Sequence, residues 1–198
     1  MTIGDEAIAA VKRHPAVQDV RLVGSRATGT ATALSDWDFA VETDDFEEVV
    51  RDIASLLDPL DPLVQQWDPL SDTWCWMAIL RGPVKLDFIF ANPHQSDPPW
   101  RPGTDNLIAI DSHFWDWVLW LAAKQTALKT DLVRSELDKL WWHILSPMGV
   151  ESRPLTIEDA LVSYLTARDR FERTLNLSVP RTLEHEIRPI LARLSGSP

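Results

Sequence analysis

Two aspartates one residue apart, Asp36 and Asp38, lie in an apolar stretch with the composition of a β-strand. Because side chains alternate along a strand, both carboxylates are expected on one face. Neighbouring carboxylates repel each other, and partial burial strengthens the repulsion. A divalent cation removes this cost, and Mg²⁺ is typically held by one or two carboxylates together with substrate phosphates. The pair therefore predicts a metal site; the alternative is an exposed pair at a strand edge or a helix N-cap.

A third carboxylate, Asp87, lies in the strand-like run "VKLDFIF" at 84–90. If this run neighbours the strand of Asp36 and Asp38, three carboxylates converge. Such a cluster could hold two Mg²⁺ ions, which in two-metal sites lie about 3.5–4 Å apart and assist an in-line displacement at phosphorus. The alternative for Asp87 is a surface position on an antiparallel strand.

A possible phosphate-binding turn precedes these acids in "GSRATG", Gly24 to Gly29. A Gly-Ser turn that opens a helix offers backbone N–H groups and a hydroxyl to phosphate oxygens. Gly24 and Ser25 are therefore candidate nucleotide-binding residues. Arg26 could add positive charge to the same phosphates, or it could be a solvated helix residue. The stretch lacks the Gly-Lys-Ser/Thr of a Walker A loop.

The elements that must position these residues show two different periodicities. Residues 17–90 contain five short runs rich in Val, Ile, Trp and Phe, which predict strands at 17–24, 36–42, 63–67, 74–80 and 84–90. Helices are expected at 4–13 and 45–57, and "RGPVK" at 81–85 predicts a turn between two antiparallel strands. The first half is thus expected to be a small mixed sheet with flanking helices.

The second half has helical periodicity after a Pro-rich crossover at 91–106. Apolar residues recur at helical spacing around 114–121 and 137–144. A capping-box-like "TIED" at 156–159 begins a third helix, and a fourth is expected at 181–194, bent or broken by Pro189. We therefore predict an α+β protein with a catalytic domain at 1–95 and a helical substrate-binding domain at 96–198.

Gly-Ser, ten further residues and then Asp-x-Asp, with a later strand acid at Asp87, resemble the polymerase-beta-type nucleotidyltransferase superfamily. The Trp-rich helical second half is similar in architecture to aminoglycoside and lincosamide nucleotidyltransferases of antibiotic resistance. The resemblance implies that Gly24 and Ser25 bind the triphosphate and that Asp36 and Asp38 ligate Mg²⁺. Asp87 would be a third ligand, the general base or both.

The same resemblance implies an enzyme that moves a nucleoside monophosphate onto a hydroxyl of a small molecule such as an aminoglycoside. The expected nucleotide is AMP, with ATP as its donor. Two alternatives remain open. One is a toxin–antitoxin-type nucleotidyltransferase that modifies a protein or RNA. The other is an inactive domain that binds nucleotide without turnover.

Composition and net charge limit the classes of partner that are expected. The chain has 198 residues and a net charge of −11, with most of the excess acid in residues 1–106. An acidic surface is poorly suited to a nucleic-acid backbone, so nucleic acid is not expected as a partner. No leader-like N-terminus or run of about 20 apolar residues is seen, and there is a single cysteine, so a cytoplasmic protein without membrane contact is expected. Exposed tryptophans in the helical half would be compatible with a homodimer.

Overall fold

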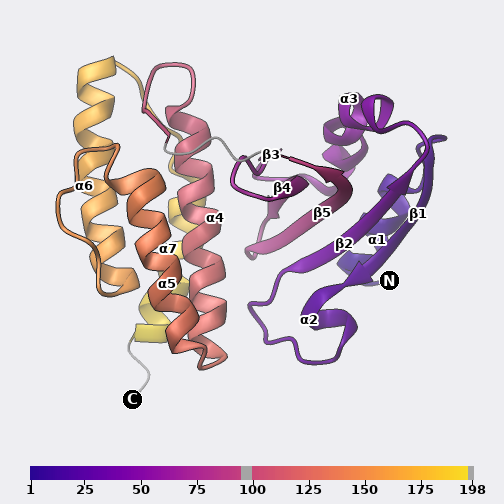
Figure 1. Ribbon diagram of the computed structural model, residues 1–198, viewed down its shortest axis with the longest axis horizontal. Coiled ribbons are helices and arrows are strands. Elements are labelled where there is room, and N and C mark those ends of the chain that lie inside the picture. The colour runs from indigo at the N-terminus through magenta and orange to yellow at the C-terminus, as the bar shows by residue number, and fades with distance from the viewer. Residues whose placement is uncertain (95–99, 196–198) are drawn as a thin grey trace. The chain divides into compact units, whose positions relative to one another are not determined.

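The computed structural model describes residues 1–94 and 100–195 (Figure 1). The chain divides into two compact units, Met1–Ser96 and Asp97–Pro198. The domain boundary expected from the sequence, between 95 and 96, and part of the Pro-rich crossover fall on 95–99, outside the described residues.

The N-terminal unit is a five-stranded mixed sheet with helices. Its elements are α1 (Ile3–Val11), β1 (Val17–Val23), α2 (Gly24–Ala27), β2 (Trp37–Thr43), α3 (Phe46–Leu57), η1 (Asp58–Leu60), β3 (Val64–Trp67), β4 (Thr73–Leu80) and β5 (Val84–Pro93). The strand order is β1-β2-β5-β4-β3. Among the strands described, β2 and β5 pair in parallel and the other neighbours are antiparallel. The late strand β5 therefore inserts beside β2.

Alternation along the strands separates a core face from a polar face. Phe39 and Val41 of β2 and Phe88 of β5 are buried in the hydrophobic core, together with α1 and α3 residues such as Ala7 and Ile53. Asp38 and Asp87 occupy the intervening positions, so they lie on the other face of the sheet. The hydrophobic pattern of the strands thus determines which face carries the carboxylates.

The structure corrects the position of Asp36, shows how short the helix after the Gly-Ser turn is, and shows that Pro189 does not break the last helix. Asp36 lies just before β2, not within it, because the strand begins at Trp37. The helix after the Gly-Ser turn is the four-residue α2, which is too short to sum many peptide dipoles. Pro189 lies inside the last helix, which continues past it.

The C-terminal unit is helical. Its elements are α4 (Leu107–Thr126), α5 (Thr130–Leu140), a π-helix η2 (Trp141–Leu145), α6 (Ile157–Leu175) and α7 (Thr182–Ser195). Thr156 caps α6 through the capping box that the sequence predicts. Most residues of α4 from Leu107 to Ala123 are buried, and α4 packs against α5, α6 and α7.

A buried polar network joins three of these helices. Asp111 of α4 accepts hydrogen bonds from the Tyr164 hydroxyl at 2.6 Å and from Arg168 at 3.3 Å. Arg168 also pairs with Glu184 of α7 at 2.7 Å. Burial raises the pKa of Asp111, an effect that its hydrogen bond from Tyr164 and the charge of Arg168 oppose. This network fixes α4, α6 and α7 to one another.

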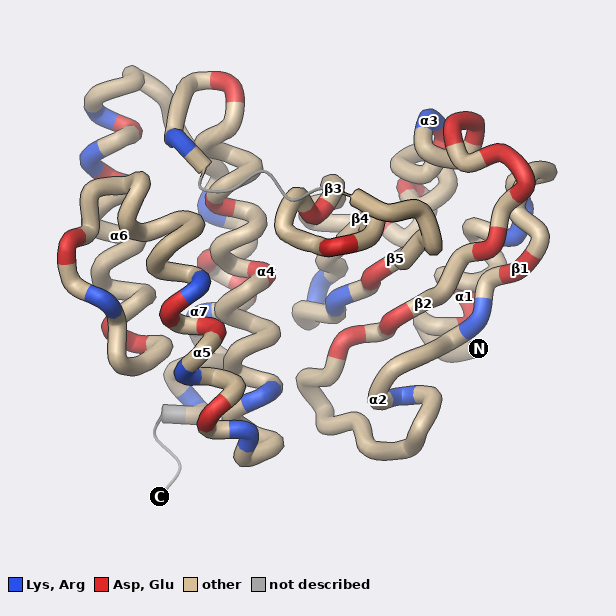
Figure 2. Tube along the Cα trace, in the orientation of Figure 1, with Lys and Arg blue, Asp and Glu red and all other residues tan. Residues whose placement is uncertain are grey.

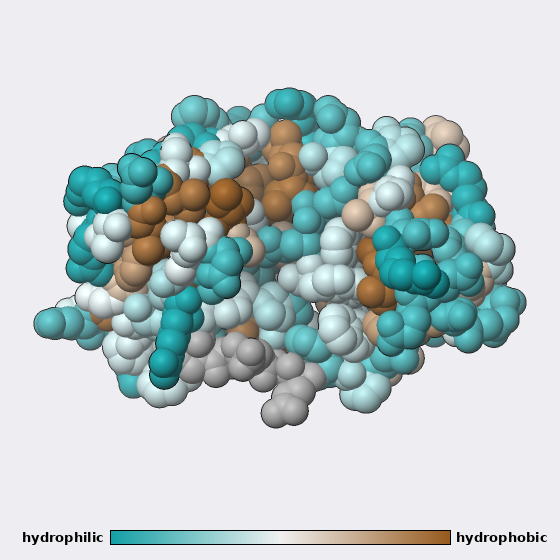
Figure 3. All heavy atoms as spheres, turned by 90° about the horizontal axis from the view of Figure 1, so that it is seen from above, coloured by the Kyte–Doolittle hydropathy of each residue, from teal (hydrophilic) through white to brown (hydrophobic). Residues whose placement is uncertain are grey.

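The face of the molecule seen in Figure 3 carries many hydrophilic residues, with local hydrophobic areas between them. On the C-terminal unit the large exposed apolar side chains include Trp142, Leu155 and Val162. Among the helices described, none combines the length and apolar character that a bilayer crossing requires.

The architecture confirms the predicted α+β class, with a mixed sheet and its helices followed by a helical unit.

Candidate active site

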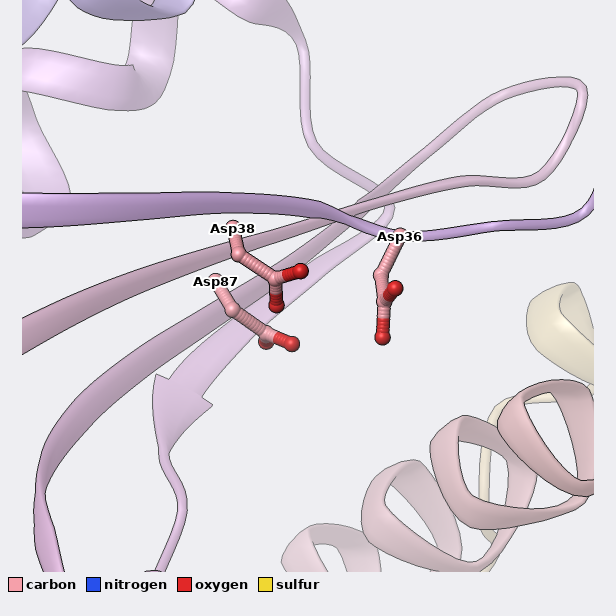
Figure 4. A group of neighbouring side chains, drawn as sticks. All are labelled: Asp36, Asp38 and Asp87. Carbon is pink, nitrogen blue, oxygen red and sulfur yellow. The ribbon is translucent and has the colours of Figure 1, made fainter. Parts of the chain in front are cut away.

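The three aspartates singled out in the sequence converge in the N-terminal unit. One carboxylate oxygen from each of Asp36, Asp38 and Asp87 lies within 4.8 Å of the other two. Figure 4 shows the three side chains on neighbouring segments, with their carboxylates directed into one region. Asp36 and Asp87 are only 7% exposed. Three carboxylates so placed offer the oxygen ligands that Mg²⁺ prefers.

Sheet pairing positions two of these carboxylates. Asp38 is opposite Asp87 in the parallel β2–β5 pair and opposite Val23 in the antiparallel β1–β2 pair. Opposed residues on paired strands direct their side chains to the same face of the sheet. Asp38 and Asp87 are therefore held next to each other by main-chain hydrogen bonding on neighbouring strands.

Asp87 is ionically paired and yet has one free oxygen. The Lys85 ammonium lies 2.7 Å from Asp87 Oδ2, and both side chains are nearly buried. Among the described residues, the buried Asp87 Oδ1 has no hydrogen-bond partner. Burial raises the pKa of Asp87; the charge of Lys85 opposes this, and the negative charge of Asp36 adds to it. One oxygen of Asp87 is thus neutralised by the protein and the other is open to a cation.

Gly24 lies against the carboxylate of Asp38. Its φ of +67° is in the left-handed region, and a Cβ at this position would lie 2.1 Å from Asp38 Oδ2. Glycine is therefore needed for both the backbone conformation and the close approach of Asp38. The turn and the Asp-x-Asp stretch, separated along the chain, form one structure.

Ser25 follows at the start of α2. Its Oγ is buried and, within the described part of the chain, makes no hydrogen bond. A buried hydroxyl without a partner costs free energy, so this atom is suited to a ligand oxygen. Because α2 is a single turn, the groups it offers are this hydroxyl and local backbone N–H groups.

Arg26 points back to the main chain that leads into β2. Its Nε donates to the carbonyl oxygens of Asp36 at 2.9 Å and Ser35 at 3.1 Å. Its guanidinium carbon lies 4.2 Å from the centroid of the Trp37 ring. Arg26 is therefore not the solvated helix residue that was the alternative from the sequence.

Sequence reasoning singled out the three acids and the turn, and strand alternation placed Lys85 on the face of Asp87. Lys85 was interpreted as an exposed strand lysine, and this is wrong, because its side chain is only 11% exposed. Its near burial and its ion pair could not be read from the sequence, because an isolated lysine in a strand is usually solvated.

Residues 5–73 match the family model described as "Nucleotidyltransferase domain". The match includes Gly24, Ser25, Asp36 and Asp38 and ends before Asp87. No curated protein is significantly similar to the chain in sequence.

Two solved structures show weak similarity. An aminoglycoside 6-adenyltransferase from Bacillus subtilis is 12% identical, with 98% of this chain and 97% of that chain covered and a TM-score of 0.33. A cytoplasmic RNA terminal U-transferase is 17% identical, with 73% of this chain and 42% of that chain covered and a TM-score of 0.39. At these TM-scores neither similarity bears on the function.

The family match confirms the resemblance seen in the Gly-Ser and Asp-x-Asp stretches. Both stretches lie within the matched residues and in the N-terminal unit. Residues 5–73, which make up most of the N-terminal unit, are therefore similar to a nucleotidyltransferase domain.

Proposed function

We propose that the chain is a Mg²⁺-dependent nucleotidyltransferase that moves a nucleoside monophosphate, with ATP as the first donor to test, onto a hydroxyl of a small molecule. The observation that carries the proposal is the convergence of Asp36, Asp38 and Asp87 beside the Gly24–Ser25 turn. Metal ligands and phosphate-binding groups are the two parts that this chemistry needs.

The residues present fit a divalent cation. Three carboxylates share one region, and Asp87 Oδ1 is buried without a donor among the residues that the structure describes. Leaving three such groups together in the absence of a cation costs electrostatic free energy. When bound, Mg²⁺ would neutralise charge on the phosphates and on the leaving pyrophosphate. Asp36, Asp38 and Asp87 would hold it.

The chain's own groups would then act on the donor and the acceptor. Ser25 Oγ and the N–H groups of the turn would bind and orient the triphosphate, with Arg26 as a further candidate contact. The acceptor hydroxyl oxygen forms a bond to the α-phosphorus, the bond from that phosphorus to the β-phosphate bridging oxygen breaks, and pyrophosphate leaves. Asp87, whose pKa burial raises, would act as a metal ligand, as the general base that accepts the hydroxyl proton, or as both.

A cationic acceptor such as an aminoglycoside is supported by charge. The net charge is −11, and acidic residues are prominent along the N-terminal unit (Figure 2). An acidic surface attracts a polycation and disfavours nucleic acid. We assign acceptor recognition to the helical unit, the role that the family resemblance implies for it.

The test is mass spectrometry of a mixture of aminoglycosides and lincosamides after incubation with Mg²⁺ and each of the common NTPs. Protein with Asp36→Asn and Asp38→Asn removes two ligands with little change of shape. Asp61→Asn is the matched control, because the side chain of Asp61 is exposed and the same chemical change is made there.

The proposal predicts a small molecule that gains one nucleotide unit with wild type and Asp61→Asn protein and not with the double variant. Transfer to a protein or an RNA from a lysate, with no small molecule modified, would overturn the acceptor. Nucleotide binding without transfer to any acceptor would contradict the proposed activity.

A further inference from the structure

The three carboxylates are not held in the same way. Asp38 and Asp87 belong to paired strands, where main-chain hydrogen bonds fix their positions. The strand register ends before Asp36, since β2 starts at Trp37 and the first residue of β2 in register with β5 is Trp37 itself. Asp36 therefore needs another support if its carboxylate is to stay beside the other two.

Arg26 supports the main chain around Asp36 through side-chain hydrogen bonds. Its Nε donates to the carbonyl oxygen of Asp36 at 2.9 Å, and Nε and a terminal nitrogen both donate to the carbonyl oxygen of Ser35. A planar guanidinium can serve two successive carbonyl groups at once with little loss of entropy. These bonds fix the peptide units on both sides of the Asp36 Cα.

Arg26 is itself anchored to the core. Its guanidinium stacks on Trp37 at 4.2 Å from the ring centroid. The Trp37 ring packs so closely on α1 that a Cβ at Gly4 would lie 2.3 Å from it. The ring also stacks on Phe39, with centroids 6.5 Å apart. The support for Asp36 thus runs from the hydrophobic core through Trp37 to Arg26.

We propose that Arg26 is a positioning residue that holds Asp36 in the metal site. The inference rests on the proposed function, because it presumes that Asp36 ligates a metal ion. In this proposal Arg26 acts mainly by holding Asp36 in position, and not by neutralising the charge of the triphosphate. Removing the supports of metal ligands typically lowers metal affinity by roughly 10- to 100-fold.

The experiment is a Mn²⁺ titration of the full chain without nucleotide, in which electron paramagnetic resonance reports free Mn²⁺. Wild type, Arg26→Ala and Arg26→Lys proteins are compared, with circular dichroism as the check on folding. Lysine keeps the positive charge but lacks the planar fork. Arg21→Ala is the matched control, because Arg21 forms an exposed ion pair with Glu42 on the same sheet.

A double-mutant cycle then identifies the route of the effect. The Arg26→Ala change is made again in Asp36→Asn protein, and the titration is repeated at higher Mn²⁺ concentration. If Arg26 acts only through Asp36, its removal has no further effect once Asp36 cannot ligate.

We expect Arg26→Ala and Arg26→Lys to weaken Mn²⁺ binding by about 10-fold or more, Arg21→Ala to leave it unchanged, and the effect to vanish in the Asp36→Asn background. Unchanged Mn²⁺ affinity in both Arg26 variants would overturn the inference, as would an equal loss with and without Asp36. Absence of Mn²⁺ binding by wild type would instead refute the metal site of the proposed function.

Discussion

Replacing Gly24 by alanine tests whether the Gly-Ser turn and Asp38 form one site. The new Cβ would lie 2.1 Å from Asp38 Oδ2, and an ordinary contact starts at 3.4 Å. The carboxylate or the turn must therefore move by about 1 Å, and a misplacement of about 1 Å can cost about 100-fold in rate. Alanine in the left-handed region also costs about 1–2 kcal/mol of stability.

Gly29→Ala separates these two effects. Gly29 has a φ of +72°, close to that of Gly24, but a Cβ there meets nothing within 4 Å. Both variants should lose about 1–2 kcal/mol of unfolding free energy, measured by urea denaturation. Only Gly24→Ala should also lose about 100-fold in kcat/KM for nucleotide transfer and weaken Mn²⁺ binding.

The result that would refute this reasoning is a Gly24→Ala protein with the stability loss of Gly29→Ala and undiminished transfer and Mn²⁺ affinity. The close contact between Gly24 and Asp38 would then have no bearing on the carboxylate's position. Equal loss of activity in both variants would show that backbone strain, not displacement of Asp38, is responsible.

Mn²⁺ binding should strengthen as the pH rises through the pKa of Asp87, which burial raises, because a protonated carboxyl does not ligate the metal. Lys85→Met removes the charge that opposes this rise, so it should move the transition to higher pH. Mn²⁺ binding that does not change with pH would contradict this prediction. Arg168→Met leaves Asp111 buried without its ion pair, so the free energy of unfolding should fall by about 3–5 kcal/mol; a loss below about 1 kcal/mol in denaturant titrations would argue against the network. Thr156→Ala removes the cap of α6 and should cost about 1 kcal/mol, whereas Thr166→Ala, which removes only a bond to the carbonyl of Val162, should not destabilise the protein; equal thermal midpoints for the two variants would refute the capping argument.

The alternation of apolar residues predicts much of the N-terminal unit. The five strands and the helices α1 and α3 form close to where the sequence places them, because each buries one apolar face. The faces of Asp38 and Asp87 also follow from alternation. The sequence therefore predicts which residues belong to the candidate site and the sheet face on which Asp38 and Asp87 lie.

The convergence of those residues depends on strand order, which alternation does not encode. Asp87 meets Asp38 only because β5 pairs in parallel with β2 after two intervening strands. The contact of Gly24 with Asp38 and the stacking of Arg26 on Trp37 are tertiary contacts of the same kind. Asp36 was placed in a strand because its neighbours are apolar, whereas the ladder starts one residue later.

The most direct test of the metal-dependent site is a crystal structure of the full chain grown with Mn²⁺ and the non-reactive analogue α,β-methylene-ATP, with anomalous diffraction at the manganese edge. The account predicts an anomalous peak bound by Asp36, Asp38 and Asp87, and a triphosphate whose oxygens contact the Gly24–Ser25 turn. A triphosphate bound elsewhere, or manganese absent from the three carboxylates while nucleotide is present, would contradict it.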